Sequence, residues 1–157
     1  MRRAVFPIVC ALVITAGGHG LAASPSPPLV VADVPTYRGD MARTGRMPGP
    51  APSGTPVVRW RMQADAPLGV PVVSGGIPYV VDDDGTVYAV DLGTGSKLWT
   101  LALGAPSDGS PPLVTDGSLV VGDACGGLHA LDLSDGSPLW TQQLDAAIAG
   151  SPASSGR

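Results

Sequence analysis

The stretch GTVYAVDLGTGSKLWTLALGAPSDGSPPL at residues 85–113 recurs in altered form as GGLHALDLSDGSPLWTQQLDAAIAGSPAS at residues 126–154. The two stretches align without a gap, and nearly half of the aligned positions are identical. Trp99 aligns with Trp140, and the remaining tryptophan, Trp60, precedes Trp99 by almost the same interval. A period of about 40 residues is typical of four-stranded β-propeller blades, whereas helical repeats of this length need runs free of glycine and proline.

Short apolar or β-branched runs mark four strands in each repeat, and glycine-rich turns separate them. The first repeat predicts strands at Val70–Val73, Pro78–Asp82, Thr86–Asp91 and Lys97–Leu101. The second predicts strands at Pro112–Thr115, Ser118–Gly122, Leu128–Asp132 and Pro138–Gln142. We therefore predict an all-β, partial propeller at 57–157, with four-stranded antiparallel blades at 67–103 and 107–144 and the start of another at 148–157.

Composition agrees with a turn-rich β protein and excludes one class of partner. The 157 residues include 22 glycines and 17 prolines, yet the mean hydropathy is +0.25, which is too apolar for a disordered chain. The repeats use many of these glycines at turns, where positive φ angles are needed. A net charge of −4 offers no basic patch for a nucleic acid.

The N-terminus has the pattern of a secretory signal peptide, which we place at residues 1–23. Arg2 and Arg3 precede the apolar run Ala4–Ala16, and small residues follow it up to a cleavage site after Ala22 or Ala23. The run is too short to span a membrane, so we expect an exported mature chain without a transmembrane span; an uncleaved anchor is the alternative. Export leaves Cys125 as the single cysteine, without an internal disulfide.

Residues 24–56 form a lead-in segment that is rich in proline and glycine. The runs SPSPP at 24–28 and MPGPAPSGTP at 47–56 are typical of an extended linker. Between them lies YRGDMARTG at 37–45, whose arginines and aromatic ring suggest docking. From composition this segment is either a solvated linker or an ordered lead-in.

A motif that surrounds the repeated tryptophans resembles the tryptophan-docking motif of pyrroloquinoline quinone (PQQ) type propeller repeats. In the first repeat it consists of Ala89, Asp91, Thr94, Gly95 and Trp99. In the second it consists of Ala130, Asp132, Asp135, Gly136 and Trp140, with Asp135 in place of the usual threonine. The resemblance covers about 57–157, and 37–45 also resembles the lead-in of secreted members. It implies that each tryptophan, Trp60 included, stacks on a neighbouring blade.

The polar residues of the repeats favour structural roles over chemistry. Asp91 and Asp132 end strands just before turns, where a carboxylate accepts hydrogen bonds from turn amides. The triplet at 82–84 suggests a calcium site, but the second repeat keeps only Asp123 there, so turn-forming acids are the preferred interpretation. His129 aligns with Tyr88, which indicates a position for a side chain with an apolar body and a polar tip; a metal or base role is the alternative.

Two functions follow as expectations. With no catalytic residue, cofactor ligand or metal ligand identifiable, the preferred one is an exported, non-catalytic binding or scaffold module whose partner is a protein or the remaining blades of a longer propeller. The alternative implied by the resemblance is the N-terminal part of a quinoprotein dehydrogenase with PQQ and calcium bound by residues beyond this chain. Self-assembly of short chains into a ring is a further possibility. The adjacent cysteine pair of many such dehydrogenases is absent.

Overall fold

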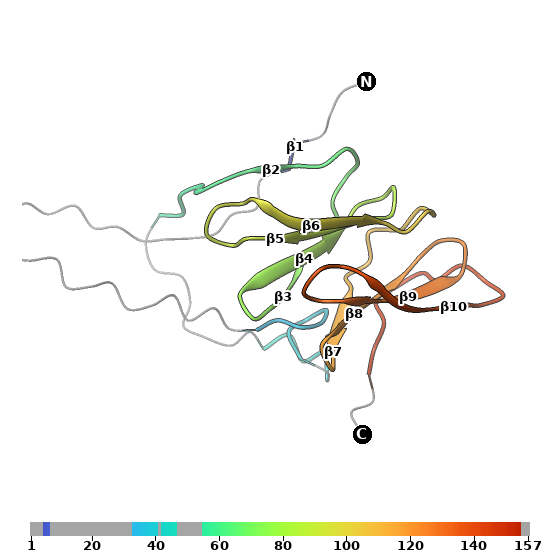
Figure 1. Ribbon diagram of the computed structural model, residues 1–157. Coiled ribbons are helices and arrows are strands. Elements are labelled where there is room, and N and C mark those ends of the chain that lie inside the picture. The colour runs from blue at the N-terminus through green and yellow to red at the C-terminus, as the bar shows by residue number, and fades with distance from the viewer. Residues whose placement is uncertain (1–4, 7–32, 41, 47–54, 155–157) are drawn as a thin grey trace, which may run out of the picture.

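The computed structural model describes residues 5–6, 33–40, 42–46 and 55–154 (Figure 1). These residues form no helix, and their main elements are two four-stranded antiparallel sheets. A short strand pair, β1 (Val5–Phe6) with β2 (Met62–Gln63), lies beside the first sheet. No helix long and apolar enough to cross a membrane occurs in this part of the chain. The predicted signal peptide and the two proline-rich runs lie almost entirely outside the described residues.

Each sheet is a simple meander in which consecutive strands are neighbours. The first contains β3 (Val72–Ser74), β4 (Ile77–Val81), β5 (Thr86–Val90) and β6 (Lys97–Ala102). The second contains β7 (Leu113–Thr115), β8 (Ser118–Gly122), β9 (Gly127–Asp132) and β10 (Pro138–Gln143). All eight predicted strands are present with ends shifted by at most two residues, so the all-β prediction of two blades is confirmed.

The turn between β7 and β8 shows how glycine sets the register. Asp116 and Gly117 have φ angles of 47° and 76°, and Thr115 pairs with Ser118 on either side of them. Two successive positive φ angles define the two-residue turn that matches the twist of a hairpin, and Asp-Gly is a preferred sequence for it. This turn fixes the register in which Val120 of β8 lies opposite Leu113 of β7.

The main core lies between the two sheets. One face of the first sheet presents a row of cross-strand neighbours, and this row packs toward the second sheet: Val72, Tyr79, Ala89 and Trp99. The facing residues of the second sheet include Leu119, Val121 and Leu131, all at most 1% exposed. Figure 1 shows the two sheets side by side, as neighbouring blades of a propeller lie.

Residues 33–36 of the lead-in are held against β3 and β7. Val34 forms both backbone hydrogen bonds of a bridge with Val73 of β3, at 2.7 and 2.9 Å. The Pro35 carbonyl accepts a hydrogen bond from the Val114 amide of β7, and Thr36 is buried. Of the two interpretations of this segment, these contacts favour an ordered lead-in over a solvated linker.

Candidate functional site

Two of the three tryptophans dock on the turn of the following repeat. The indole N–H of Trp60 donates to the Leu92 carbonyl at 2.7 Å, and that of Trp99 donates to the Leu133 carbonyl at 3.0 Å. Each ring also packs closely against a glycine. A Cβ on Gly95 would fall 2.6 Å from the Trp60 ring, and one on Gly136 would fall 2.5 Å from the Trp99 ring. Only glycine permits this approach.

The aspartates of the same motif organise the turns on which the tryptophans rest. Asp91 Oδ1 accepts hydrogen bonds from the amide and hydroxyl of Thr94, at 2.7 and 2.8 Å. Asp132 Oδ1 accepts from the amide and hydroxyl of Ser134, one position earlier in the turn, at 2.8 and 2.5 Å. These bonds lower the pKa of both carboxyls below the ordinary value. Asp135 also accepts a bond from the Ser137 amide, so the second turn closes without the threonine of the first.

Trp140 has the same position in its blade but a different environment. The second sheet repeats the cross-strand row of the first with Leu113, Val120, Ala130 and Trp140. The inner three residues of this row are buried, whereas Trp140 is 48% exposed. Leu139 beside it is 52% exposed and Leu144 is 45% exposed. The strand β10 and the residue after it therefore present large apolar side chains to solvent, which is a common property of interaction sites.

A buried aspartate pairs with an aromatic side chain at the same place in each blade. In the first blade Asp82 is 0% exposed; its Oδ1 accepts from the Thr86 amide at 2.7 Å and its Oδ2 from the Tyr88 hydroxyl at 2.8 Å. Burial, together with the bond to Asp82, raises the pKa of Tyr88 to about 12. The Lys97 ammonium lies 4.5 Å from the centre of the Tyr88 ring.

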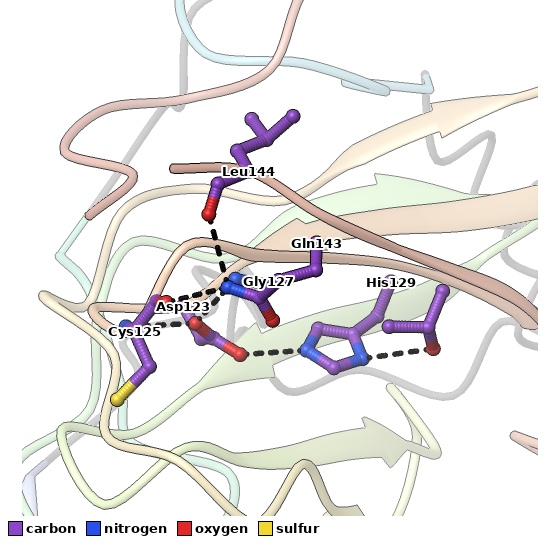
Figure 2. Close-up of polar contacts among 7 residues, drawn as sticks. Asp123, Cys125, Gly127, His129, Gln143 and Leu144 are labelled. Carbon is purple, nitrogen blue, oxygen red and sulfur yellow. Dashed lines mark hydrogen bonds and ion pairs between the residues drawn. The ribbon is translucent and has the colours of Figure 1, made fainter. Parts of the chain in front are cut away.

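The second blade uses histidine at this position (Figure 2). Asp123 is 3% exposed, and its Oδ1 accepts from the amides of Cys125 and Gly127 at 2.8 and 2.7 Å. Its Oδ2 lies 2.7 Å from His129 Nε2. Burial alone would raise the pKa of Asp123, but the bonds from His129 and the two amides outweigh it and lower the pKa below its ordinary value.

Gly127 makes room for the shorter imidazole. A Cβ at Gly127 would fall 2.3 Å from Asp123 Oδ2 and 2.7 Å from His129 Nε2, so the pair occupies the space that a side chain would need. The corresponding residue of the first blade is Thr86, where the longer Tyr88 reaches its aspartate instead. Sequence reasoning missed these aspartate pairs, although the interval between Asp82 and Tyr88 recurs between Asp123 and His129.

The chemical capacity of this cluster is limited. Thr141 Oγ1 lies 3.3 Å from His129 Nδ1, so hydroxyl, imidazole and carboxylate stand in line. In enzymes that use a hydroxyl nucleophile, a carboxylate orients a histidine toward that hydroxyl in the same way. However, Asp123 is engaged by two amides, and the first blade places a tyrosine in the same slot. The repeated arrangement therefore fits a structural role, in which the aspartate ties one strand to the start of the next, better than the role of a catalytic base.

The acidic residues do not fit a calcium site. Both oxygens of Asp82 accept hydrogen bonds from protein donors, which leaves its neighbours Asp83 and Asp84 on the exposed turn. Among the described residues no three histidine, cysteine or acidic side chains gather as metal ligands. Calcium takes six to eight oxygens, so this part of the chain does not supply the set. Cys125 is a free, exposed thiol.

Comparison with protein families places this geometry in context. Residues 51–108 and 83–157 both match the profile of a PQQ-type repeat family that is described as outer membrane protein assembly factor BamB. Together the matches cover residues 51–157, which is more than half of the chain. The chain belongs to the PQQ-type β-propeller repeat family. No curated protein matches it significantly.

Two solved structures are similar to this chain. BamB from Moraxella catarrhalis is 30% identical over 59% of this chain and 28% of its own, with a TM-score of 0.47. The quinohemoprotein alcohol dehydrogenase from Comamonas testosteroni is 23% identical over 78% of this chain and 22% of its own, with a TM-score of 0.59. The latter likeness concerns the fold alone. This PQQ-type chain thus spans about a quarter of the length of either structure.

Proposed function

We propose that the chain is an exported, non-catalytic binding and scaffold module of a larger PQQ-type propeller. The observation that carries the proposal is the unequal environment of its three tryptophans. Trp60 and Trp99 each lie on a glycine and donate to a backbone carbonyl, whereas Trp140 is 48% exposed at an apolar edge. A surface that offers a flat glycine turn and a free carbonyl is the matching partner for Trp140.

Two kinds of partner offer such a surface. One is a further blade of the same propeller, because a blade built like the second would present its turn to Trp140 as Gly136 is presented to Trp99. The other is a separate protein that uses the same contact. The family description, an outer membrane protein assembly factor, supports a role in holding proteins together.

Capture of partners from the exported fraction tests this function. The protein as cells make it is tagged, and wild type is compared with Trp140→Ala and Leu98→Ala. Leu98 is a matched control because it is 51% exposed on the outer strand β6 of the first blade. We expect Trp140→Ala to lose a bound protein, or to loosen the following blade toward protease, while Leu98→Ala behaves as wild type. Equal behaviour of the two variants contradicts the proposal.

Export has its own test. The family description and the pattern at residues 1–23 both support passage across the inner membrane. We expect N-terminal sequencing of the mature protein to begin after Ala22 or Ala23. A mature chain that begins at Met1 in the cytoplasmic fraction contradicts export.

The second candidate is the N-terminal part of a quinoprotein dehydrogenase. The fold similarity to a quinohemoprotein alcohol dehydrogenase brings it into consideration, but the acidic residues of the described blades do not fit calcium, so ligands would have to lie outside them. The test adds PQQ and calcium to the protein as cells make it and follows dye-linked oxidation of alcohols and sugars. Activity would replace the scaffold proposal, and its absence would remove the dehydrogenase.

A further inference from the structure

A pocket of about 450 Å³ lies where the lead-in segment meets the chain before β7 and residues 150–151. Its walls come from three separate segments: Tyr37 and Arg43 of the lead-in, residues 108–111 before β7, and residues 150–151. The pocket is distinct from the apolar edge at Trp140 and from the cluster around His129. Its volume is in the range of sites that bind small molecules.

Arg43 is fixed at the wall of this pocket. Its Nη2 donates to the carbonyls of Ser151 and Pro152 at 2.9 and 3.1 Å. Its backbone is held in the left-handed region, with a φ of 54°, and its amide donates to the Asp40 carbonyl at 2.8 Å. The guanidinium has no carboxylate partner among the described residues. Since it carries five N–H donors, Nη1 and Nε remain available to a ligand.

Asp108, in another segment of the lining, supplies hydrogen-bond acceptors. Asp108 Oδ1 accepts from the Ser110 amide at 2.9 Å, and Asp108 Oδ2 accepts from the Gly150 amide at 3.2 Å. Burial alone would raise the pKa of Asp108, but the bonds from Ser110 and Gly150 lower it below the ordinary value, so the group is a carboxylate at neutral pH. The Ser110 side chain also hydrogen-bonds to this carboxylate, so three of its roughly four acceptor positions are used and one stays open to a ligand donor.

We propose that this pocket binds a small carboxylate that also carries an N–H donor on the α-carbon, with Arg43 holding the carboxylate and Asp108 accepting from the nitrogen. Free amino acids and the C-terminal residue of a peptide share this chemistry. A dianion such as phosphate is disfavoured because Asp108 would repel it. Tyr37, which is 44% exposed, adds a flat apolar wall beside the site.

Amide-shift titrations on the full chain test the proposal with three probes. Glycine represents a free amino acid, N-acetylglycine represents a peptide C-terminus, and N-acetylglycinamide lacks the carboxylate. We expect glycine or N-acetylglycine to shift the amides of Gly109, Ser110 and Gly150, and the better of the two identifies the source. N-acetylglycinamide should bind at least tenfold more weakly, since it cannot form a charge-assisted pair with the guanidinium.

Variants separate the site from the fold. Arg43→Gln should weaken binding at least tenfold, while Arg46→Gln, in the same lead-in but without a side-chain contact among the described residues, should bind as wild type. If Arg43→Gln does not fold, Asp108→Asn serves instead and should weaken glycine more than acetate. The proposal is overturned if neither carboxylate probe shifts these amides, if N-acetylglycinamide binds equally well, or if Arg46→Gln weakens binding as much as Arg43→Gln. If Trp140→Ala captures the same partners as wild type, the proposed function fails, but the titrations of this pocket still give their own answer.

Discussion

Substitution of Gly136 by alanine tests the tryptophan dock directly, because the chain contains a matched control. Gly136 and Gly117 have the same φ angle of 76°, so alanine at either position meets the same backbone cost. That cost is about 1–2 kcal/mol for the left-handed region. A Cβ at Gly117 meets nothing within 4 Å, whereas one at Gly136 falls 2.5 Å from Trp99 Cε3. The difference between the variants therefore isolates the dock.

The size of that difference follows from what the added methyl displaces. The ring of Trp99 must retreat, which costs about 1–3 kcal/mol as overpacking of a close contact. The retreat also stretches the 3.0 Å bond from the indole N–H to the Leu133 carbonyl, worth about 1 kcal/mol. We expect Gly136→Ala to lose about 2–4 kcal/mol more stability than Gly117→Ala.

Urea unfolding of both variants, followed by far-ultraviolet circular dichroism, measures this difference. The slopes must agree with wild type, so that a shift in midpoint reports stability. Gly95→Ala repeats the test at the other dock, where the Cβ would fall 2.6 Å from the Trp60 ring. If Gly136→Ala and Gly117→Ala lose the same stability to within about 0.5 kcal/mol, the contact of Trp99 with Gly136 does not stabilise the blade pair.

Three further predictions concern the aspartate pairs. The pKa of Asp123 is lower in the folded protein than the value of about 3.9 in the unfolded chain, so its charge stabilises the fold above about pH 4. This contribution is lost as the pH falls through the lower, folded-state pKa. The urea midpoints of wild type should therefore fall more steeply below about pH 4 than those of Asp123→Asn. Tyr88→Phe should cost about 1–3 kcal/mol, because Asp82 stays buried without its hydroxyl donor. The same substitution should remove a phenolate absorbance transition near pH 12. Because the pKa of Tyr88 is raised in the folded protein, its contribution to the stability of wild type is present below about pH 10 and is lost as the pH rises through 12. Gly127→Thr should cost about 1–3 kcal/mol alone, and adding His129→Tyr should restore part of it, since the first blade combines these residue types; additive losses in urea would contradict this.

The sequence repeat was sufficient to predict the strands but not the contacts that join them. Alternation and turn residues determine which backbone positions pair, and they do so locally, so all eight strands of the two blades were predictable. The partner of Trp99, in contrast, is a backbone carbonyl at Leu133, and a carbonyl has no sequence signature. The Arg43 contact joins residues 108 positions apart, which composition alone does not indicate. The residue types of the dock were therefore predictable, whereas its geometry needed the structure.

The two aspartate pairs show why alignment within one chain is informative about chemistry. A histidine beside an aspartate, taken alone, has the components of a general base. In this chain the same buried carboxylate position is filled twice, once with tyrosine and once with histidine, and both aspartates also bind backbone amides at the start of the next strand. A tyrosine whose pKa is raised to about 12 does not exchange protons at neutral pH. What the two positions share is a side-chain donor that reaches a buried carboxylate, so hydrogen bonding explains why a histidine stands at position 129. The imidazole of His129 is shorter than the tyrosine side chain of the first blade. The pair of Asp123 and His129 therefore occupies space that a side chain at position 127 would need, which explains the glycine there.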